Sequence, residues 1–391
     1  MRTGRFFVAI VGFAAMALTA FMANAENGVT ADKIVFGQVA ALDGPAAALG
    51  QGMHTGLLAA FNEANHAGGI KGRTLDLVAL DDGYEPDKAI TGAKTLINDN
   101  KVFALIGAVG TPTSAAVQPI AAEAGVPFIG AFTGAEFLRD PSKTGVVNVR
   151  ASYFQETETM VEHLTQDLGV TRIAIFYQDD AYGQAGLAGV KRALDKRKMS
   201  LVSEGTYERN TTAVKSALLS IRKGDPQAVI MIGAYKPSAE FIRLARRIKM
   251  DATFVNISFV GAEALAKELG TDGAGVVVTE VVPFPSDASI SVVARYQAAL
   301  KAVNPGTQPG FVSLEGYIVG RLVTAALDKI PGDITRQALL DAIAKTGTFD
   351  LGGMTLSYGP GNNRGSSKVF LTVVQGDGTL KPVDKLPKPN S

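Results

Sequence analysis

The chain has 391 residues, no cysteine and three histidines, with 38 basic against 37 acidic side chains. The balanced charge offers no basic surface for nucleic acid or anionic lipid, and the absence of thiols excludes cysteine nucleophiles and thiolate metal sites. The length favours two domains over one and allows a hydrophobic core that needs no disulfides.

The first 25 residues have the order of a secretory signal peptide. Arg2 and Arg5 precede an apolar run from Phe6 to Met22, and Ala23-Asn24-Ala25 is a small-residue cleavage pattern. Because the run falls short of the ~20 residues that a bilayer span needs, export is favoured over a membrane anchor. We predict cleavage after Ala25. Since there is no cysteine to carry a lipid, we also predict a freely diffusing protein in the periplasm.

Short apolar strands alternate with amphipathic helices from residue 33 onward, as in buried parallel sheets. The first half predicts strands at 33–40, 74–80, 103–107, 126–130 and 146–150, and helices at 50–66, 87–98 and 113–123. The series then restarts, with helices at 153–168, 181–195, 212–221, 237–249 and 261–269, and strands at 172–177, 201–206, 228–232, 253–257 and 275–279. A proline-containing crossover at 281–287 leads to helices at 289–303, 312–327 and 335–345, and to β structure between 354 and 374.

Two consecutive runs of βα units predict an α/β protein with two doubly wound, three-layer lobes. In such sheets, ligands bind outside the carboxyl ends of the strands. The loops that follow each strand are therefore the candidates for a binding site.

Two of these loops carry small residues and hydroxyls just before a helix or turn. They contain Gly110 and Thr111 after one strand, and Thr133 and Gly134 after the next. Helix capping explains either loop alone, but free backbone N–H groups after two neighbouring strands favour a site for a carboxylate. In the second half, loops at the same edge supply Tyr153, Tyr182, Tyr235 and Ser258. One such tyrosine is often a core or surface filler, whereas several on one edge favour the wall of a pocket.

Several short motifs have an order and spacing similar to those of a known protein family. They are LDGPAAALGQGMHTG at 42–56, AGGIK at 67–71, Asp81-Asp82, LIG at 105–107, FTGA at 132–135 and DDAYG at 179–183. From about residue 32 to 374, the chain resembles type I periplasmic binding proteins of the Leu/Ile/Val-binding branch, the substrate-binding subunits of ABC importers. The resemblance implies a monomer without cofactor that carries a small ligand to a membrane permease.

The resemblance also implies roles for single residues. The loops at Gly110–Thr111 and Thr133–Gly134 would hold the ligand carboxylate, Tyr182 would close on the ligand from the second lobe, and Tyr235 would contribute. Ser258 stands where amino-acid-binding relatives place an acid for the α-ammonium. Either Asp180 or Glu280 substitutes for that acid, or the ligand is not a plain α-amino acid.

Leu49, on the first loop, stands where relatives place an aromatic, which indicates a different side-chain pocket. Ligands of this branch are branched-chain amino acids, amides or aromatic carboxylates. The resemblance also implies a three-strand hinge, with crossings near Arg150, Val281 and Tyr358. Lobe 1 would comprise residues 26–150 and 282–357, and lobe 2 residues 151–281 and 358–391.

An enzyme is the first alternative, and the sequence disfavours it. His54, His66 and His163 lack metal-ligand spacing, and there is no nucleophile elbow or phosphate-binding loop. The segment from Gly107 to Gly110 lacks the third glycine of a dinucleotide fingerprint. The second alternative, a periplasmic ligand sensor without a transport role, would bind in the same way and stays open.

Overall fold

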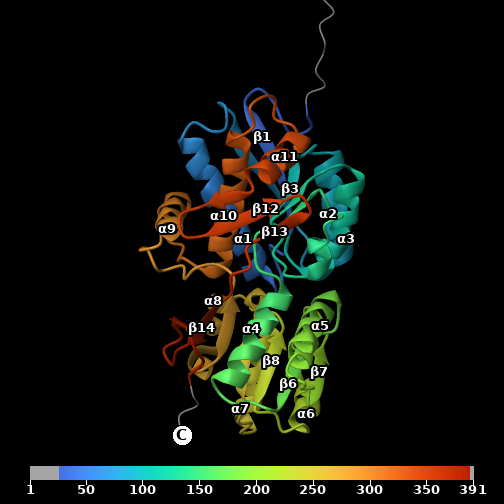
Figure 1. Ribbon diagram of the computed structural model, residues 1–391, viewed down its shortest axis with the longest axis vertical. Coiled ribbons are helices and arrows are strands. Elements are labelled where there is room, and N and C mark those ends of the chain that lie inside the picture. The colour runs from blue at the N-terminus through green and yellow to red at the C-terminus, as the bar shows by residue number, and fades with distance from the viewer. Residues whose placement is uncertain (1–25, 388–391) are drawn as a thin grey trace, which may run out of the picture.

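The computed structural model describes residues 26–387, so the predicted signal peptide lies outside the described residues. The chain forms two α/β lobes stacked along the long axis of the molecule (Figure 1). No helix between residues 26 and 387 combines the length and the apolar character needed to cross a membrane.

Lobe 1 is built on a five-stranded parallel sheet in the order β2-β1-β3-β4-β5. Its central strand β1 is buried at seven of its eight positions, as the continuous apolar run predicts. The strands are β1 (Lys33–Ala40), β2 (Thr74–Asp81), β3 (Ala104–Ile106), β4 (Phe128–Ile129) and β5 (Val146–Val147).

The two faces of this sheet are covered by helices from both ends of the chain. They are α1 (Ala47–His66), α2 (Pro86–Asn98), α3 (Thr111–Glu123), α9 (Ser291–Val303), α10 (Phe311–Asp328) and α11 (Arg336–Thr346), with the short 3₁₀ helix η1 (Glu136–Arg139). Helices α1 and α10 lie close together because glycines face each other. A Cβ on Gly316 would overlap the backbone of Met53, and one on Gly56 would overlap that of Ser313.

Lobe 2 is built on a seven-stranded mixed sheet in the order β15-β14-β10-β9-β8-β6-β7. The five strands from β6 to β10 are parallel, whereas β14 runs antiparallel to β10 and β15 antiparallel to β14. The strands are β6 (Ile173–Gln178), β7 (Ser203–Tyr207), β8 (Ala228–Ile232), β9 (Thr253–Asn256), β10 (Val277–Glu280), β14 (Phe370–Val374) and β15 (Leu380–Val383).

The helices of lobe 2 are α4 (Tyr153–Gln166), α5 (Ala181–Asp195), α6 (Lys215–Arg222), α7 (Tyr235–Arg247) and α8 (Ala262–Leu269), with the 3₁₀ helices η2 (Ser258–Val260) and η3 (Gly270–Gly273). Four of these five α-helices follow strands of lobe 2 itself, and α4 follows β5 at the crossing from lobe 1. Ser152 and Gln155 form a capping box at α4, and the side chain of Asp180 caps α5. These caps fix where the chain turns from the lobe interface into each helix.

A small antiparallel sheet lies near the third predicted crossing. It consists of β11 (Thr348–Asp350), β12 (Thr355–Gly359) and β13 (Asn362–Gly365). The hydroxyl of Tyr358 donates to the carbonyl of Asn148, and the N–H of Asn148 donates to the carbonyl of Asn363. Residues 358–365 therefore lie with lobe 1, because their backbone pairs there. We propose that the chain crosses between the lobes after Gly365 rather than near Tyr358.

We propose a division in which lobe 1 holds residues 26–150 and 282–365 and lobe 2 holds the rest of the described chain. Three residues that the sequence placed in loops instead lie within the first turn of a helix: Leu49 in α1, Thr111 in α3 and Tyr235 in α7. Prolines follow closely after Thr111 and Tyr235, and the first turn tolerates them because its N–H groups have no helical partner.

Candidate functional site

The carboxyl ends of both central sheets meet at the junction of the lobes, where three predicted hydroxyls form a chain. Thr111 at the start of α3 and Thr133 after β4 lie with their Oγ1 atoms 2.6 Å apart. The Oη of Tyr153, at the start of α4, lies 3.4 Å from Thr133 Oγ1. All three side chains are buried. The sequence order of strands and loops thus brings hydroxyls from both lobes to one point beside the N-terminus of α3.

Glycines allow the backbone to come close at this point. Gly110 has a φ of 104°, and a Cβ there would overlap the ring of Tyr84. A Cβ on Gly134 would overlap Tyr153, whose N–H donates to the carbonyl of Gly134. Gly110 and Gly134 therefore fit the site through their backbones, as the sequence predicts for residues beside an anion-binding loop.

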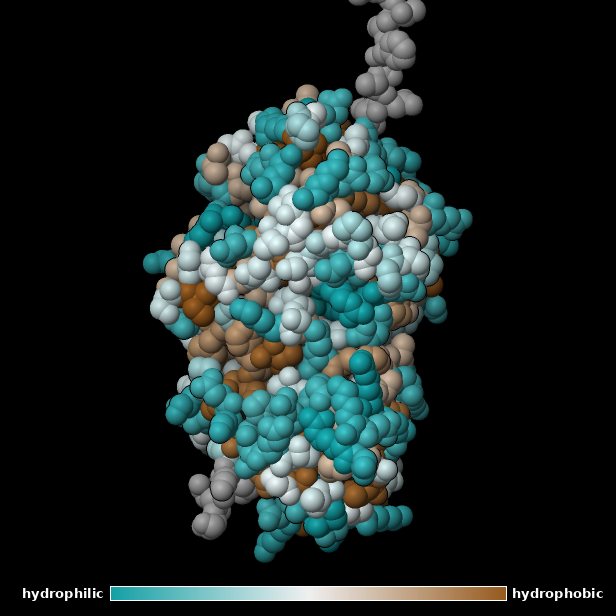
Figure 2. Space-filling view, viewed as in Figure 1, coloured by the Kyte–Doolittle hydropathy of each residue, from teal (hydrophilic) through white to brown (hydrophobic). Residues whose placement is uncertain are grey.

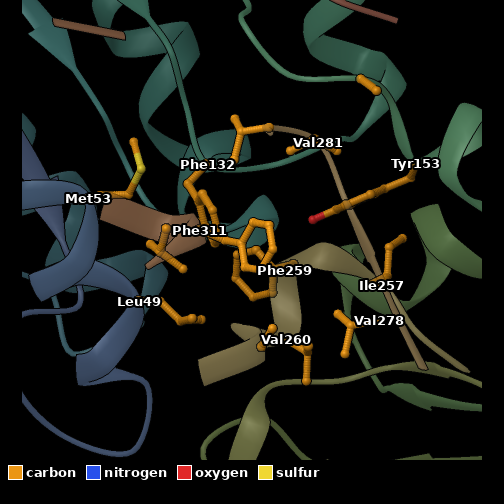
Figure 3. Close-up of a cluster of buried hydrophobic side chains, with 14 of the residues drawn as sticks. Leu49, Met53, Phe132, Tyr153, Ile257, Phe259, Val260, Val278, Val281 and Phe311 are labelled. Atoms are coloured by element: carbon orange, nitrogen blue, oxygen red, sulfur yellow. The ribbon is translucent and has the colours of Figure 1, made fainter. Parts of the chain in front are cut away.

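An aromatic cluster lies next to the hydroxyls and joins the lobes (Figure 3). Phe259 in η2 is at its centre, with its ring centroid 5.3 Å from that of Phe132 and 4.6 Å from that of Tyr182. The ring of Tyr182 lies 5.6 Å from that of Tyr153. The sequence predicts Tyr153 and Tyr182 for this wall, and also Phe259 beside Ser258 after the strand at 253–257, but it does not predict Phe132. The aromatic character of Phe132 directly after a strand is the signal that could have found it.

Leu49 and Tyr235 lie at another part of the junction. Leu49 is fully buried near Gly261, where its Cδ2 would lie 2.6 Å from an added Cβ. The hydroxyl of Tyr235 accepts a weak hydrogen bond of 3.4 Å from the N–H of Ala48. Both residues thus bridge the lobes through the start of α1, but neither is bonded to the threonine hydroxyls.

Ser258 lies in a buried polar network that the sequence did not predict. Its N–H and Oγ each donate to Glu156 at 3.0 Å, and Thr279 donates to the same carboxylate at 2.7 Å. The guanidinium of Arg150 donates to Ser258 Oγ. Burial raises the pKa of Glu156 despite the opposing effect of Arg150 and these hydrogen bonds. A charged residue within the apolar segment at 146–151 was the available signal for Arg150.

The two acids considered as substitutes for an ammonium partner have different surroundings. Asp180 accepts from the N–H of Tyr182 and forms an ion pair with Arg209 at 2.9 Å. Its negative charge is therefore already balanced within lobe 2. Glu280, at the end of β10, is buried, and its Oε1 has no hydrogen-bond partner within the described chain. Burial raises the pKa of Glu280 well above its usual range, which favours the uncharged carboxyl.

The rim of the junction holds a cavity of about 330 Å³ between the lobes, a size suited to a small ligand. Tyr84 and Ala46 line it from lobe 1, and Gln178, Tyr207 and Asn210 from lobe 2. The amide of Gln178 donates to the hydroxyl of Tyr84 at 3.2 Å, which joins the lobes behind the cavity. Because Tyr84 also lies 5.9 Å from Phe259, ring to ring, the cavity adjoins the aromatic cluster.

A second cleft crosses the lobe junction on the face shown in Figure 2, where hydrophobic residues gather. It has a volume of about 590 Å³ and is lined by Phe284, Pro285, Pro309 and Phe311 among others. None of the predicted site residues lines it. Across residues 26–387, no group of three or more His, Asp or Glu side chains is placed to hold a metal ion.

Several solved structures and curated proteins are similar to this chain. A structure from Rhodopirellula baltica, described as a possible leucine/isoleucine/valine-binding protein, is 39% identical with a TM-score of 0.86, covering 92% of this chain and 98% of its own. A substrate-binding periplasmic protein from Ralstonia solanacearum is 28% identical with a TM-score of 0.84, over 89% of this chain and 99% of its own. The Leu/Ile/Val-binding protein BraC3 of Rhizobium johnstonii is 27% identical over 321 residues, which cover 79% of this chain and 83% of that protein.

These relatives are named for binding rather than for catalysis, in agreement with a site that joins two lobes around hydroxyls and aromatic rings. The family model described as periplasmic binding protein matches residues 33–379, nearly the whole described chain. The chain therefore belongs to the periplasmic binding protein family, in its Leu/Ile/Val-binding type.

Proposed function

We propose that this protein captures a small carboxylate-bearing ligand between its lobes and delivers it, as a monomer in the periplasm, to the permease of an ABC importer. The hydroxyl pair of Thr111 and Thr133 is the observation that carries the proposal. Both hydroxyls are buried, they come from neighbouring strand ends, and they lie at the N-terminus of α3, where the helix dipole favours an anion.

The relatives support the part of the proposal that concerns ligand capture in the periplasm. Their names describe Leu/Ile/Val-binding and substrate-binding periplasmic proteins. Ser258 stands where the resemblance implies an acid in amino-acid-binding relatives, and its side chain bonds to Arg150 and Glu156, so we do not restrict the ligand to α-amino acids. Branched-chain amino-acid-like molecules, amides and aromatic acids with a carboxylate all fit the proposal.

A thermal-shift panel of amino acids, amides and aromatic acids tests the ligand class. A carboxylate ligand at 100 times its Kd should stabilise the fold by about 2.7 kcal/mol, which is several degrees in Tm. Stabilisation by uncharged ligands alone would show that the threonine pair does not hold a carboxylate.

Matched variants test the residues. Thr111→Val and Thr133→Val should each weaken binding of the best panel ligand by about tenfold, because a charge-assisted hydrogen bond is lost. Thr165→Val is the control, since that hydroxyl bonds to the carbonyl of Val161 within α4, away from the site. Loss of uptake on deleting the adjacent permease gene would support the importer role, and undiminished uptake would oppose it.

A further inference from the structure

Arg150 lies between the two loops that meet at the candidate site. It follows β5, at the first crossing between the lobes, and its side chain is 1% exposed. Its guanidinium carbon lies 4.6 Å from the ring centroid of Phe132 in lobe 1, and its Nη2 donates to Ser258 in lobe 2. Phe132 directly precedes Thr133, so the guanidinium packs on the chain neighbour of one of the two threonines.

Much of this guanidinium lacks hydrogen-bond acceptors. Arg150 Nε and Nη1 are buried and have no partner within the described chain, although they carry three of its five N–H groups. Arg139, the neighbouring buried arginine, shows the contrast: it donates to the carbonyls of Ala135 at 2.9 Å and of Arg150 at 3.0 Å. Arg139 therefore has a complete structural role, whereas Arg150 has donors free for another molecule.

The positive charge of Arg150 already has counter-charges. Its Nη2 lies 3.8 Å from Glu156, and its Nε lies 3.6 Å from Glu315. Burial raises the pKa of Glu156, although Arg150 and the three donors from Ser258 and Thr279 act in the opposite direction and stabilise its ionised form. A second full negative charge at this point would be repelled by these carboxylates, and an ammonium would be repelled by Arg150 itself. The free N–H groups thus suit a neutral acceptor oxygen.

We propose that Arg150 determines specificity by binding a neutral oxygen next to the ligand carboxylate, as in a 2-oxo or 2-hydroxy acid, in preference to the ammonium of a 2-amino acid. The inference rests on the proposed function, since the carboxylate at Thr111 and Thr133 sets the position of the neighbouring carbon. It also agrees with the surroundings of Ser258, because the acid at that point, Glu156, already accepts hydrogen bonds from Ser258 and Thr279.

The test compares acids that differ only at carbon 2. Isothermal titration would use 4-methyl-2-oxopentanoate, 2-hydroxy-4-methylpentanoate, leucine and 4-methylpentanoate, and the matching set with a benzyl side chain. The oxo or hydroxy acid should bind at least about tenfold more tightly than the amino acid and the unsubstituted acid, the effect of one hydrogen bond to a charged donor.

Variants connect this preference to one side chain. In Arg150→Met the oxo acid and the unsubstituted acid should bind within about twofold of each other, and Arg150→Lys should retain part of the preference because it keeps a donor. Arg172→Met is the control, since Arg172 is an exposed arginine paired with Asp225 on the far side of lobe 2. It should bind all acids like the wild type.

The outcomes separate this inference from the proposed function. If the amino acid binds as tightly as the oxo acid or more tightly, or if Arg150→Met keeps the preference, the role of Arg150 is overturned while carboxylate capture stands. If no acid of either set binds and only uncharged ligands do, carboxylate capture fails and the inference fails with it. The comparison of the oxo acid with the amino acid in the wild-type protein tests the preference assigned to Arg150 even if Arg150 variants do not fold.

Discussion

Glu85 should hold the lobes together at the rim of the junction. Its carboxylate accepts from Arg209 at 2.8 Å and from Asn210 at 2.7 Å, and both donors belong to the turn after β7 in lobe 2. Arg209 also pairs with Asp180 of its own lobe at 2.9 Å. When the lobes separate, Arg209 keeps Asp180 and loses Glu85. A change at Glu85 therefore acts on the closed form alone.

The size of the expected shift follows from how exposed the two paired side chains are. The side chains of Arg209 and Glu85 are 22% and 40% exposed, so solvent screening limits their pair to about 0.5–1 kcal/mol. Glu85→Gln should thus shift the ratio of closed to open molecules by about two- to fivefold. Glu85→Ala also removes the bond to Asn210, which adds about 1 kcal/mol. Its shift, for a total of about 1.5–2 kcal/mol, should therefore reach about thirteen- to thirtyfold.

Distances between spin labels measure this ratio directly. The chain has no cysteine, so Asp87→Cys and Lys215→Cys provide exposed labelling sites, one in each lobe. The open population should rise with Glu85→Gln and rise further with Glu85→Ala, and salt should open the wild type more than either variant. Asp225→Asn is the control, because it breaks a pair within lobe 2. An unchanged distance distribution in Glu85→Ala would refute the reasoning.

Three further predictions concern single residues. Burial raises the pKa of Asp82 to about 7 in the folded protein, so the free energy of unfolding should fall as pH rises from about 4 to 7. In chemical denaturation, Asp82→Asn should reduce this fall by up to about 4 kcal/mol. An unaltered dependence of stability on pH in the variant would contradict the prediction. Gly316→Ala should lower the free energy of unfolding by about 1–3 kcal/mol because α1 leaves no room for a Cβ, whereas Gly332→Ala, in open space, should change it little. Tyr182→Ala should weaken ligand binding by at least about tenfold in titration, since its ring packs on Phe259, yet leave a cooperative thermal transition; an unchanged affinity would remove Tyr182 from the site.

The sequence was sufficient for the fold because its signals are local. The run at Lys33–Ala40 and the periodicity at Ala181–Asp195 match β1 and α5 at both ends, and the two runs of βα units match the two parallel sets of strands. The helix starts at Leu49 and Tyr235 were missed because no side-chain cap marks them. The pairing of Tyr358 with Asn148 was not predictable because it joins segments 210 residues apart.

The site was predictable only in part for the same reason. Thr111 and Thr133 were found because each follows an apolar strand, and parallel strands bring such positions to one edge. Arg150 and Glu156 were not predicted because their partner Ser258 is 108 and 102 residues away in the sequence. A charge within an apolar segment indicates that a partner exists, but only the folded chain identifies it.

The late arrival of β14 in the lobe 2 sheet has a consequence for how this molecule is made. β14 pairs with β10, and β10 belongs to a set of strands that begins at residue 173. The sheet is therefore complete only after β14 has been synthesised, almost two hundred residues after the start of β6. Lobe 1 likewise needs α10 against α1. Neither lobe can complete its native contacts until the C-terminal segments have been synthesised, and such non-local pairing slows folding. The topology thus delays the finished core of both lobes to the end of translation.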